Sequence, residues 1–167
     1  YKEGFSSALV DNVFDRCKVI KGEIIDPFAG SGATLFVASR RGLDSTGIEL
    51  LPIGCEIIKA RREAISHRSE VISALKKWKV SNHWIESKQQ GVPFPHLTIT
   101  NGAFPHNSEE RLGKYLRAVS NLKQRSVRTV LRAAALAVLE DISFTRKDGQ
   151  YLRWDYRSGR RQGEKPF

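Results

Sequence analysis

One short segment of the sequence combines residue types that suit binding of a nucleoside cofactor. The segment reads Asp26-Pro27-Phe28-Ala29-Gly30-Ser31-Gly32-Ala33-Thr34. Gly30 and Gly32 remove side chains where a ligand would meet the backbone. The helix expected to begin after them offers unpaired amide donors and the positive end of its dipole. Glu49 follows about twenty residues later, where a carboxylate can accept hydrogen bonds from both hydroxyls of a ribose. The pattern therefore predicts a site for an adenosine-type cofactor.

The details of the glycine turn separate the possible cofactors. A phosphate-binding loop would end in Gly-Lys-Ser/Thr, and this turn has no lysine. A dinucleotide fingerprint would need a third glycine at position 35, which is Leu35. A cofactor with a ribose but no phosphate fits best, and S-adenosylmethionine is the common one. The alternative is an ordinary strand, turn and helix that binds nothing.

The elements expected around this turn predict the α/β class with a doubly wound sheet. A buried strand is predicted at 23–26, a helix at 34–41 that Gly42 ends, and a second strand at 45–50. Pro52 opens a helical pattern that continues to about residue 79. Beyond it the sequence predicts a loop-rich stretch at 80–107 with a short strand at 97–100. Two helices, about 109–119 (capped by Ser108) and 126–140, and a hairpin at 142–156 follow.

The cofactor segment resembles the corresponding motif of prokaryotic DNA amino-methyltransferases of the cytosine-N4 and adenine-N6 type. Their motif usually continues with two threonines, and here Ala33 replaces the first while Thr34 is kept. Residues 46–50 resemble the second motif of the family, which implies that Glu49 holds the ribose and Leu50 packs on the adenine. Residues 2–7 resemble the segment that contacts the methionine end, and 140–155 resemble a segment of one branch of these enzymes. The cofactor-binding residues implied are Phe5, Ser6, Ser7, Asp26, Pro27, Phe28, Ala29, Gly30, Ser31, Gly32, Thr34, Glu49 and Leu50.

The same resemblance implies a methyl transfer for which this sequence lacks the catalytic motif. These enzymes act on an exocyclic amine of a flipped base with Asp, Asn or Ser, then Pro-Pro, then an aromatic residue. None of the six prolines is adjacent to another. The motif order places the catalytic motif after Phe167, so we expect a fragment with no catalytic residue of its own. The expected partners are DNA, the rest of the same polypeptide and a cognate restriction endonuclease.

The charge of the chain is unevenly distributed and predicts a polyanion partner for its second part. Residues 1–60 hold seven basic and eight acidic side chains, whereas residues 61–167 hold 21 basic and ten acidic ones. Such segregation favours phosphate contacts over a uniformly solvated surface. The predicted DNA contacts are Arg125, Arg128, Arg132, Arg146, Lys147, Arg153 and Trp154. Packing of aromatic residues across the hairpin is an equally good reading of Trp154.

These patterns divide the chain into three predicted segments: a cofactor-binding α/β part at 1–79, a loop and helical extension at 80–140, and a basic hairpin and tail at 141–167. The predicted architecture is thus a partial Rossmann-like methyltransferase sheet with a helical extension and a C-terminal hairpin. Two cysteines make no disulfide framework and favour a cytoplasmic protein. No metal-ligand spacing and no membrane span is present in the sequence. A catalytically inactive DNA-binding or assembly subunit and an RNA methyltransferase are the alternative functions.

Overall fold

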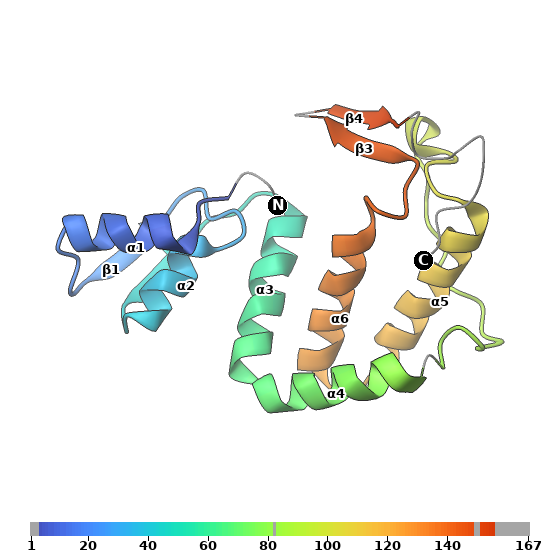
Figure 1. Cartoon of the computed structure of the whole chain (residues 1–167), viewed down its shortest axis with the longest axis horizontal. Helices are drawn as coiled ribbons and strands as arrows, with labels where there is room; N and C mark the ends of the chain where they lie inside the picture. Colours follow the sequence, from blue (N-terminus) through green and yellow to red (C-terminus); the bar gives the residue numbers. More distant parts are fainter. Residues whose placement is uncertain (1–3, 82, 149–150, 156–167) are drawn as a thin grey trace. The chain divides into compact units, whose positions relative to one another are not determined.

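The computed structural model describes residues 4–81, 83–148 and 151–155, and it contains helices and strands in two compact units. Contacts group the chain into Tyr1–Arg62 and Glu63–Phe167, and Figure 1 shows the elements of each. The mixture of helix and strand agrees with the predicted α/β class. The functional division at residues 79 and 140 stays a prediction.

The first unit contains a βαβ arrangement preceded by a helix. Its elements are α1 (Ser7–Arg16), β1 (Glu23–Asp26), α2 (Ala33–Arg40), β2 (Asp44–Gly47) and most of α3 (Pro52–Ser66). The strands β1 and β2 pair in parallel, from Glu23 opposite Asp44 to Asp26 opposite Gly47. Parallel neighbours need a crossover, which α2 supplies here. The sheet among the described residues of this unit has these two strands alone.

The core of the first unit covers one face of this small sheet. Val10 and Phe14 of α1 are buried against Val37 and Ala38 of α2, and Ile24 packs on this cluster. Successive strand residues point to opposite faces, so Ile25 points away from the Ile24 face and is 66% exposed. The expectation of a buried strand at 23–26 is therefore wrong for the described chain, because none of its four residues is buried.

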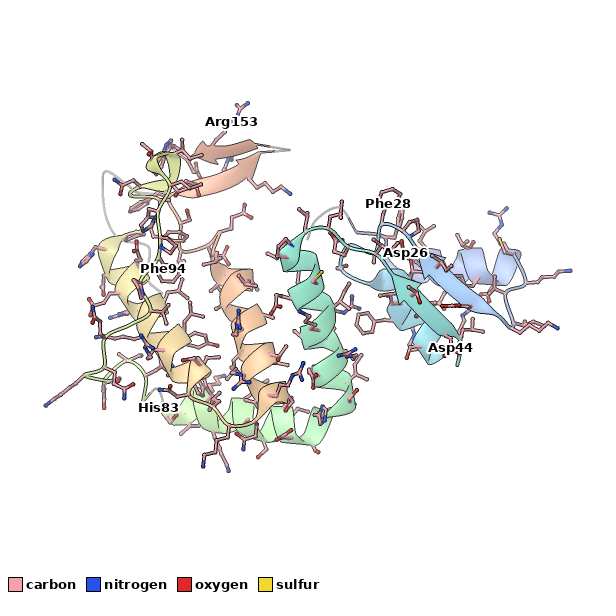
Figure 2. All side chains as sticks on the ribbon, turned by 180° about the vertical axis from the view of Figure 1, so that it is seen from behind. Asp26, Phe28, Asp44, His83, Phe94 and Arg153 are labelled. Atoms are coloured by element: carbon pink, nitrogen blue, oxygen red, sulfur yellow. The ribbon has the colours of Figure 1, made fainter. Side chains whose placement is uncertain are left out.

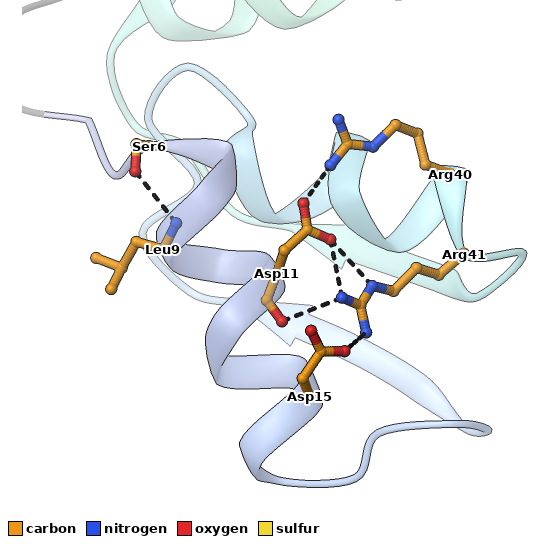
Figure 3. A network of polar contacts seen from close by, with 6 residues as sticks. All are labelled: Ser6, Leu9, Asp11, Asp15, Arg40 and Arg41. Carbon is orange, nitrogen blue, oxygen red and sulfur yellow. Dashed lines mark hydrogen bonds and ion pairs between the residues drawn. The ribbon is translucent and has the colours of Figure 1, made fainter.

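A polar network joins α1 to the end of α2, as Figure 3 shows. Ser6 begins α1 by accepting a hydrogen bond from the Leu9 amide at 3.2 Å. The Arg41 guanidinium donates to carboxylate oxygens of Asp11 at 3.0 Å and Asp15 at 2.7 Å. Arg40 donates to the second Asp11 oxygen at 2.6 Å. The hydrogen bond from Arg41 lowers the pKa of the Asp15 carboxyl below its ordinary value.

This lowered pKa predicts a pH-dependent contribution of Asp15 to stability. A carboxyl whose pKa is lower in the folded state contributes stability above its unfolded pKa and loses it as the pH falls through the folded pKa. Asp15→Asn should therefore unfold at lower urea concentration than the unsubstituted chain at neutral pH. The difference should shrink below the ordinary value of 3.8. Asp44→Asn, which lies outside this network, is the control, and an unchanged difference at about pH 3 would contradict the prediction.

The second unit is a helical bundle that carries a hairpin. It contains α4 (Arg68–Ser81), α5 (His106–Ser120), α6 (Arg125–Val138), β3 (Thr145–Asp148) and β4 (Tyr151–Trp154), with a short 3-10 helix at Thr98–Thr100. Both α4 and α5 contact α6, and α5 and α6 run in opposite directions (Figure 1). The core gathers eight buried residues: Trp84, Leu112, Tyr115, Val119, Val127, Leu131, Ala135 and Ile142. Burial raises the pKa of Tyr115 to about 12, and its hydroxyl donates to the Leu131 carbonyl at 3.0 Å.

Three expected elements of this region differ in the structure. The helical pattern from Pro52 to residue 79 forms two helices, with His67 between α3 and α4. The expected strand at 97–100 is a 3-10 helix. Ser108 was expected to cap a helix, but α5 starts two residues earlier and buries Ser108 within it. The hairpin is confirmed by β3 and β4, and the two residues between these strands, 149 and 150, lie outside the described residues.

No helix in the described part of the chain is both long enough and apolar enough to cross a membrane.

Candidate functional site

The glycine turn is shaped by hydrogen bonds that begin at the end of β1. The Asp26 side chain accepts a hydrogen bond from the Phe28 amide at 3.0 Å, and the Asp26 carbonyl accepts one from the Ile48 amide at 2.9 Å. The Ala29 amide donates to the Ile48 carbonyl at 2.9 Å. These bonds fasten the segment after β1 to the segment after β2. The ends of both strands therefore meet at one edge, where parallel sheets bind ligands.

Positive backbone angles at the turn explain its two glycines. Gly30 has φ +53° and Gly32 has φ +82°, a region that other residues rarely adopt. Gly32 is also the residue that precedes α2. A Cβ on Gly32 would lie 2.9 Å from Ile58 of α3 and 3.0 Å from Phe36. Its missing side chain thus makes room for neighbouring helices, and it does not line the adjacent pocket.

A cavity of about 540 Å³ opens beside this turn within the first unit. Ten of the thirteen predicted cofactor residues line it: Phe5, Asp26, Pro27, Phe28, Ala29, Gly30, Ser31, Thr34, Glu49 and Leu50. Ser6 and Ser7, by contrast, begin α1 and do not line it. The remaining lining residues, Gly4, Ala33, Ile48 and Leu51, were not among the predicted cofactor-binding residues.

The cavity combines two oriented carboxylates, those of Asp26 and Glu49, with exposed apolar surface. Glu49 Oε1 accepts a hydrogen bond from the Leu51 amide at 2.7 Å, which fixes the direction of the side chain. Phe28 and Leu50 are 89% and 90% exposed, and Phe28 projects outward from the turn (Figure 2). Large apolar side chains beside fixed polar groups are typical of small-molecule sites. The arrangement can hold a ligand that has an apolar ring and hydroxyls.

Two residues of α3, Gly54 and Arg61, contact residues that line the cavity, and the sequence alone did not single them out. A Cβ on the buried Gly54 would lie 2.8 Å from the Glu49 carboxylate carbon and 2.9 Å from the Gly30 carbonyl oxygen. Arg61 donates from Nη1 to the Ser31 carbonyl at 2.7 Å. Glycine at one helical position and arginine seven residues later carry no recognisable local signal, because their contacts with Gly30 and Ser31 span 24 and 30 residues of sequence.

The predicted DNA-contacting residues lie in two places in the second unit. Arg125, Arg128 and Arg132 are all on α6. Arg125 and Arg132 are exposed, whereas Arg128 donates to the Leu122 carbonyl at 3.1 Å and so also fastens the turn before α6. The other four, Arg146, Lys147, Arg153 and Trp154, lie on β3 and β4.

The hairpin places two of these arginines directly opposite each other. Arg146 of β3 pairs with Arg153 of β4 in the antiparallel register. Opposite residues of such a pair point to the same face of the hairpin, and like charges there repel. Figure 2 shows Arg153 pointing away from the hairpin.

No group of three or more His, Cys, Asp or Glu side chains that could hold a metal ion occurs within residues 4–81, 83–148 and 151–155.

Comparison with known proteins found relatives over the whole chain. The chain is 41% identical over 169 residues to Type II methyltransferase M.AvaI from Nostoc sp., and the alignment covers all of this chain and 35% of the relative. It is 40% identical over 162 residues to Type II methyltransferase M.BsoBI from Geobacillus stearothermophilus, covering 95% of this chain and 31% of the relative. A shorter stretch of 60 residues, 36% of this chain and 20% of the relative, is 40% identical to Type II methyltransferase M.ScaI from Streptomyces caespitosus. No family model and no solved structure matches the chain.

The matches indicate the kind of protein from which this chain comes. Over its whole length the chain is similar to a segment of Type II methyltransferases, which agrees with the methyltransferase resemblance inferred from residues 26–34 and 46–50. More particularly, the chain spans about a third of the length of M.AvaI and M.BsoBI.

Proposed function

We propose that this chain is the cofactor-binding portion of a site-specific DNA methyltransferase. The parent enzyme would transfer a methyl group from S-adenosylmethionine to an exocyclic amine of cytosine or adenine, in a restriction-modification system of the cytoplasm. The observation that carries the proposal is the convergence of the glycine turn, Glu49 and Leu50 on one cavity. The names of the relatives support methyl transfer and do not favour the alternatives of an inactive assembly subunit or an RNA methyltransferase.

The residues that line the cavity suit the parts of S-adenosylmethionine. Glu49 would accept hydrogen bonds from the ribose hydroxyls, and Leu50 would pack on the adenine. The Phe5 segment and Asp26 would face the methionine end, with Thr34 at the start of α2 nearby. When bound, the cofactor supplies an electrophilic methyl group, while the residues of this chain orient it and exclude water from one side. The sheet would be part of a larger Rossmann-like sheet in the parent enzyme.

Titration calorimetry of the chain with three ligands tests this proposal. S-adenosylmethionine and S-adenosylhomocysteine should bind, and NAD should bind much more weakly, because the turn lacks the third glycine of a pyrophosphate site. Tighter binding of NAD than of either adenosyl ligand would overturn the assignment.

Substitution of Gly54 should weaken adenosyl-ligand binding although it favours the helix. Alanine is the better helix former by about 1 kcal/mol, so Gly54→Ala should keep α3 folded. Its added Cβ must displace either the Glu49 side chain or the Gly30 carbonyl, both less than 3 Å away. Overpacking of this kind costs about 1–3 kcal/mol, and we expect roughly tenfold weaker binding of S-adenosylhomocysteine. Lys59→Ala on the exposed side of α3 is the control, and equal affinities of the two variants would contradict the expectation.

The chain by itself should not methylate DNA. It contains no Pro-Pro sequence, and a flipped base needs acceptors for its amine and an aromatic surface to stack on. Incubation with radiolabelled S-adenosylmethionine and unmethylated DNA should leave the DNA at background, with a full-length Type II methyltransferase as the positive control. Label in the DNA from a preparation free of other methyltransferases would refute this prediction.

A further inference from the structure

Arg61 of α3 reaches back to the glycine turn, although it does not line the cavity. Its Nη1 donates a hydrogen bond to the Ser31 carbonyl at 2.7 Å. Its guanidinium carbon also lies 4.1 Å from the centre of the Phe36 ring in α2. A guanidinium over an aromatic face is attracted to the ring, and the stacking restricts the direction in which its donors point. Arg61 is therefore held by α2 while it contacts the turn.

The contact falls on the peptide group at which the chain turns into α2. The Ser31 carbonyl of this group accepts the bond from Arg61, and the Gly32 amide of the same group donates to the Ala29 carbonyl at 2.7 Å. Gly32 holds a positive φ of +82°. Because a peptide group is planar, bonds at both of its ends fix its orientation. That orientation sets the direction of the neighbouring turn, which faces the cavity.

Arg61 is partly buried where it makes this bond. Partial burial lowers the pKa of the guanidinium, although arginine remains charged at neutral pH. A charged donor to a carbonyl makes a stronger hydrogen bond than a neutral donor does. The neighbouring Arg62 is exposed, so the two adjacent arginines differ in environment.

We propose that Arg61 is a positioning residue for the cofactor turn: it holds the Ser31–Gly32 peptide so that the turn keeps the shape that the ligand binds. This proposal rests on the proposed function, since it assumes that the cavity binds an adenosyl cofactor. Gly54 lies near the start of the same helix and leaves room for the Glu49 side chain. Together, Arg61 and Gly54 make α3 the element that fixes the position of the turn relative to Glu49.

The first test compares three variants by titration calorimetry with S-adenosylhomocysteine. Arg61→Met keeps much of the side-chain length but has no donor, and it should weaken binding roughly tenfold. Arg61→Lys should recover part of the loss, because an ammonium can donate to the same carbonyl without stacking in the same way. Arg62→Met removes an equal charge from the exposed neighbouring position and should bind as the unsubstituted chain does. Equal binding by Arg61→Met and Arg62→Met would overturn the proposal.

The second test needs no ligand and is read from amide NMR spectra. Loss of the bond to the Ser31 carbonyl should move the Gly32 amide resonance in Arg61→Met. The resonances of Gly22 and Gly42, which also have positive φ but lie in open surroundings, should stay in place and report that the variant is folded. An unmoved Gly32 resonance would refute the contact itself. Failure of the unsubstituted chain to bind any adenosyl ligand would instead refute the proposed function, while this spectrum would still decide whether Arg61 holds the turn.

Discussion

Glu49→Ala should weaken binding of S-adenosylhomocysteine by roughly two orders of magnitude, the largest effect that we expect from one side chain of the cavity. Each hydrogen bond to a charged group contributes about 1.5–3 kcal/mol, and two ribose hydroxyls would lose their acceptor. The side chain is already directed by the bond from the Leu51 amide at 2.7 Å, so little ordering is needed when the ligand binds. Calorimetric titration at constant pH and salt measures the change.

Two further variants separate the charge of Glu49 from its structural bond. Glu49→Gln keeps an oxygen for the Leu51 amide, so it should retain the local fold and bind with intermediate affinity. Glu23→Gln is the control, because Glu23 starts β1 and accepts a hydrogen bond from Thr46 at 2.9 Å away from the cavity lining. An affinity loss in Glu23→Gln as large as that in Glu49→Ala would mean that the unit is being destabilised, and would contradict a specific role for Glu49.

The sequence predicted the turn and its two strands because their signals are local. Glycines with positive φ, a proline after the first strand and an acid at the end of the second all lie within about 30 residues. Ten of the thirteen predicted cofactor residues gather at one cavity for the same reason, since residues on one turn must share one surface, and their role in binding stays a prediction. The helix α1 went unassigned, although Ser6 as a cap with Val10 and Phe14 four residues apart forms the expected pattern.

Other features could not be predicted because distant packing decides them. The helical pattern from Pro52 to residue 79 continues through His67, but the chain begins a new helix there. One anchor of α4 is the bond from Ser126 to Glu70 at 2.7 Å, which joins residues 56 apart. The support of the turn by Arg61 and the space left by Gly54 likewise depend on how α3 packs. Periodicity predicts that helices form but does not predict which side chains they bring to a site.

The second large effect concerns DNA, and we expect the hairpin to contribute more to binding than α6 does. Cross-strand pairing sets Arg146 and Arg153 opposite each other on one face of the hairpin, where two guanidinium groups can contact neighbouring phosphates. On α6, Arg128 is bonded to the Leu122 carbonyl, which leaves Arg125 and Arg132 as the exposed pair. Both sets belong to the part of the chain with 21 basic and ten acidic side chains.

Two double variants that remove equal charge can separate these surfaces. Arg146→Gln with Arg153→Gln should flatten the dependence of log affinity on log salt by up to about 1.8, since each phosphate contact contributes about 0.9 to the slope. Arg125→Gln with Arg132→Gln should change the slope less. Arg128 is left in place in both, so that the turn before α6 keeps its bond. Fluorescence anisotropy with a labelled unmethylated duplex over a range of salt concentrations gives the slopes.

The outcomes distinguish a specific contact surface from overall charge. Equal flattening in both double variants would mean that net charge alone attracts DNA, because each variant removes two positive charges. A larger effect of the α6 variant would move the contact surface to the helix. Phosphate contacts carry little base information, so replacing the hairpin arginines should weaken binding to unrelated duplexes by similar factors.

Trp154 follows Arg153 on β4 and so points to the opposite face of the hairpin, where it is 42% exposed, and an aromatic ring can stack on a base. Trp154→Ala should therefore lower affinity without changing the salt slope, and a changed slope in that variant would contradict a stacking role.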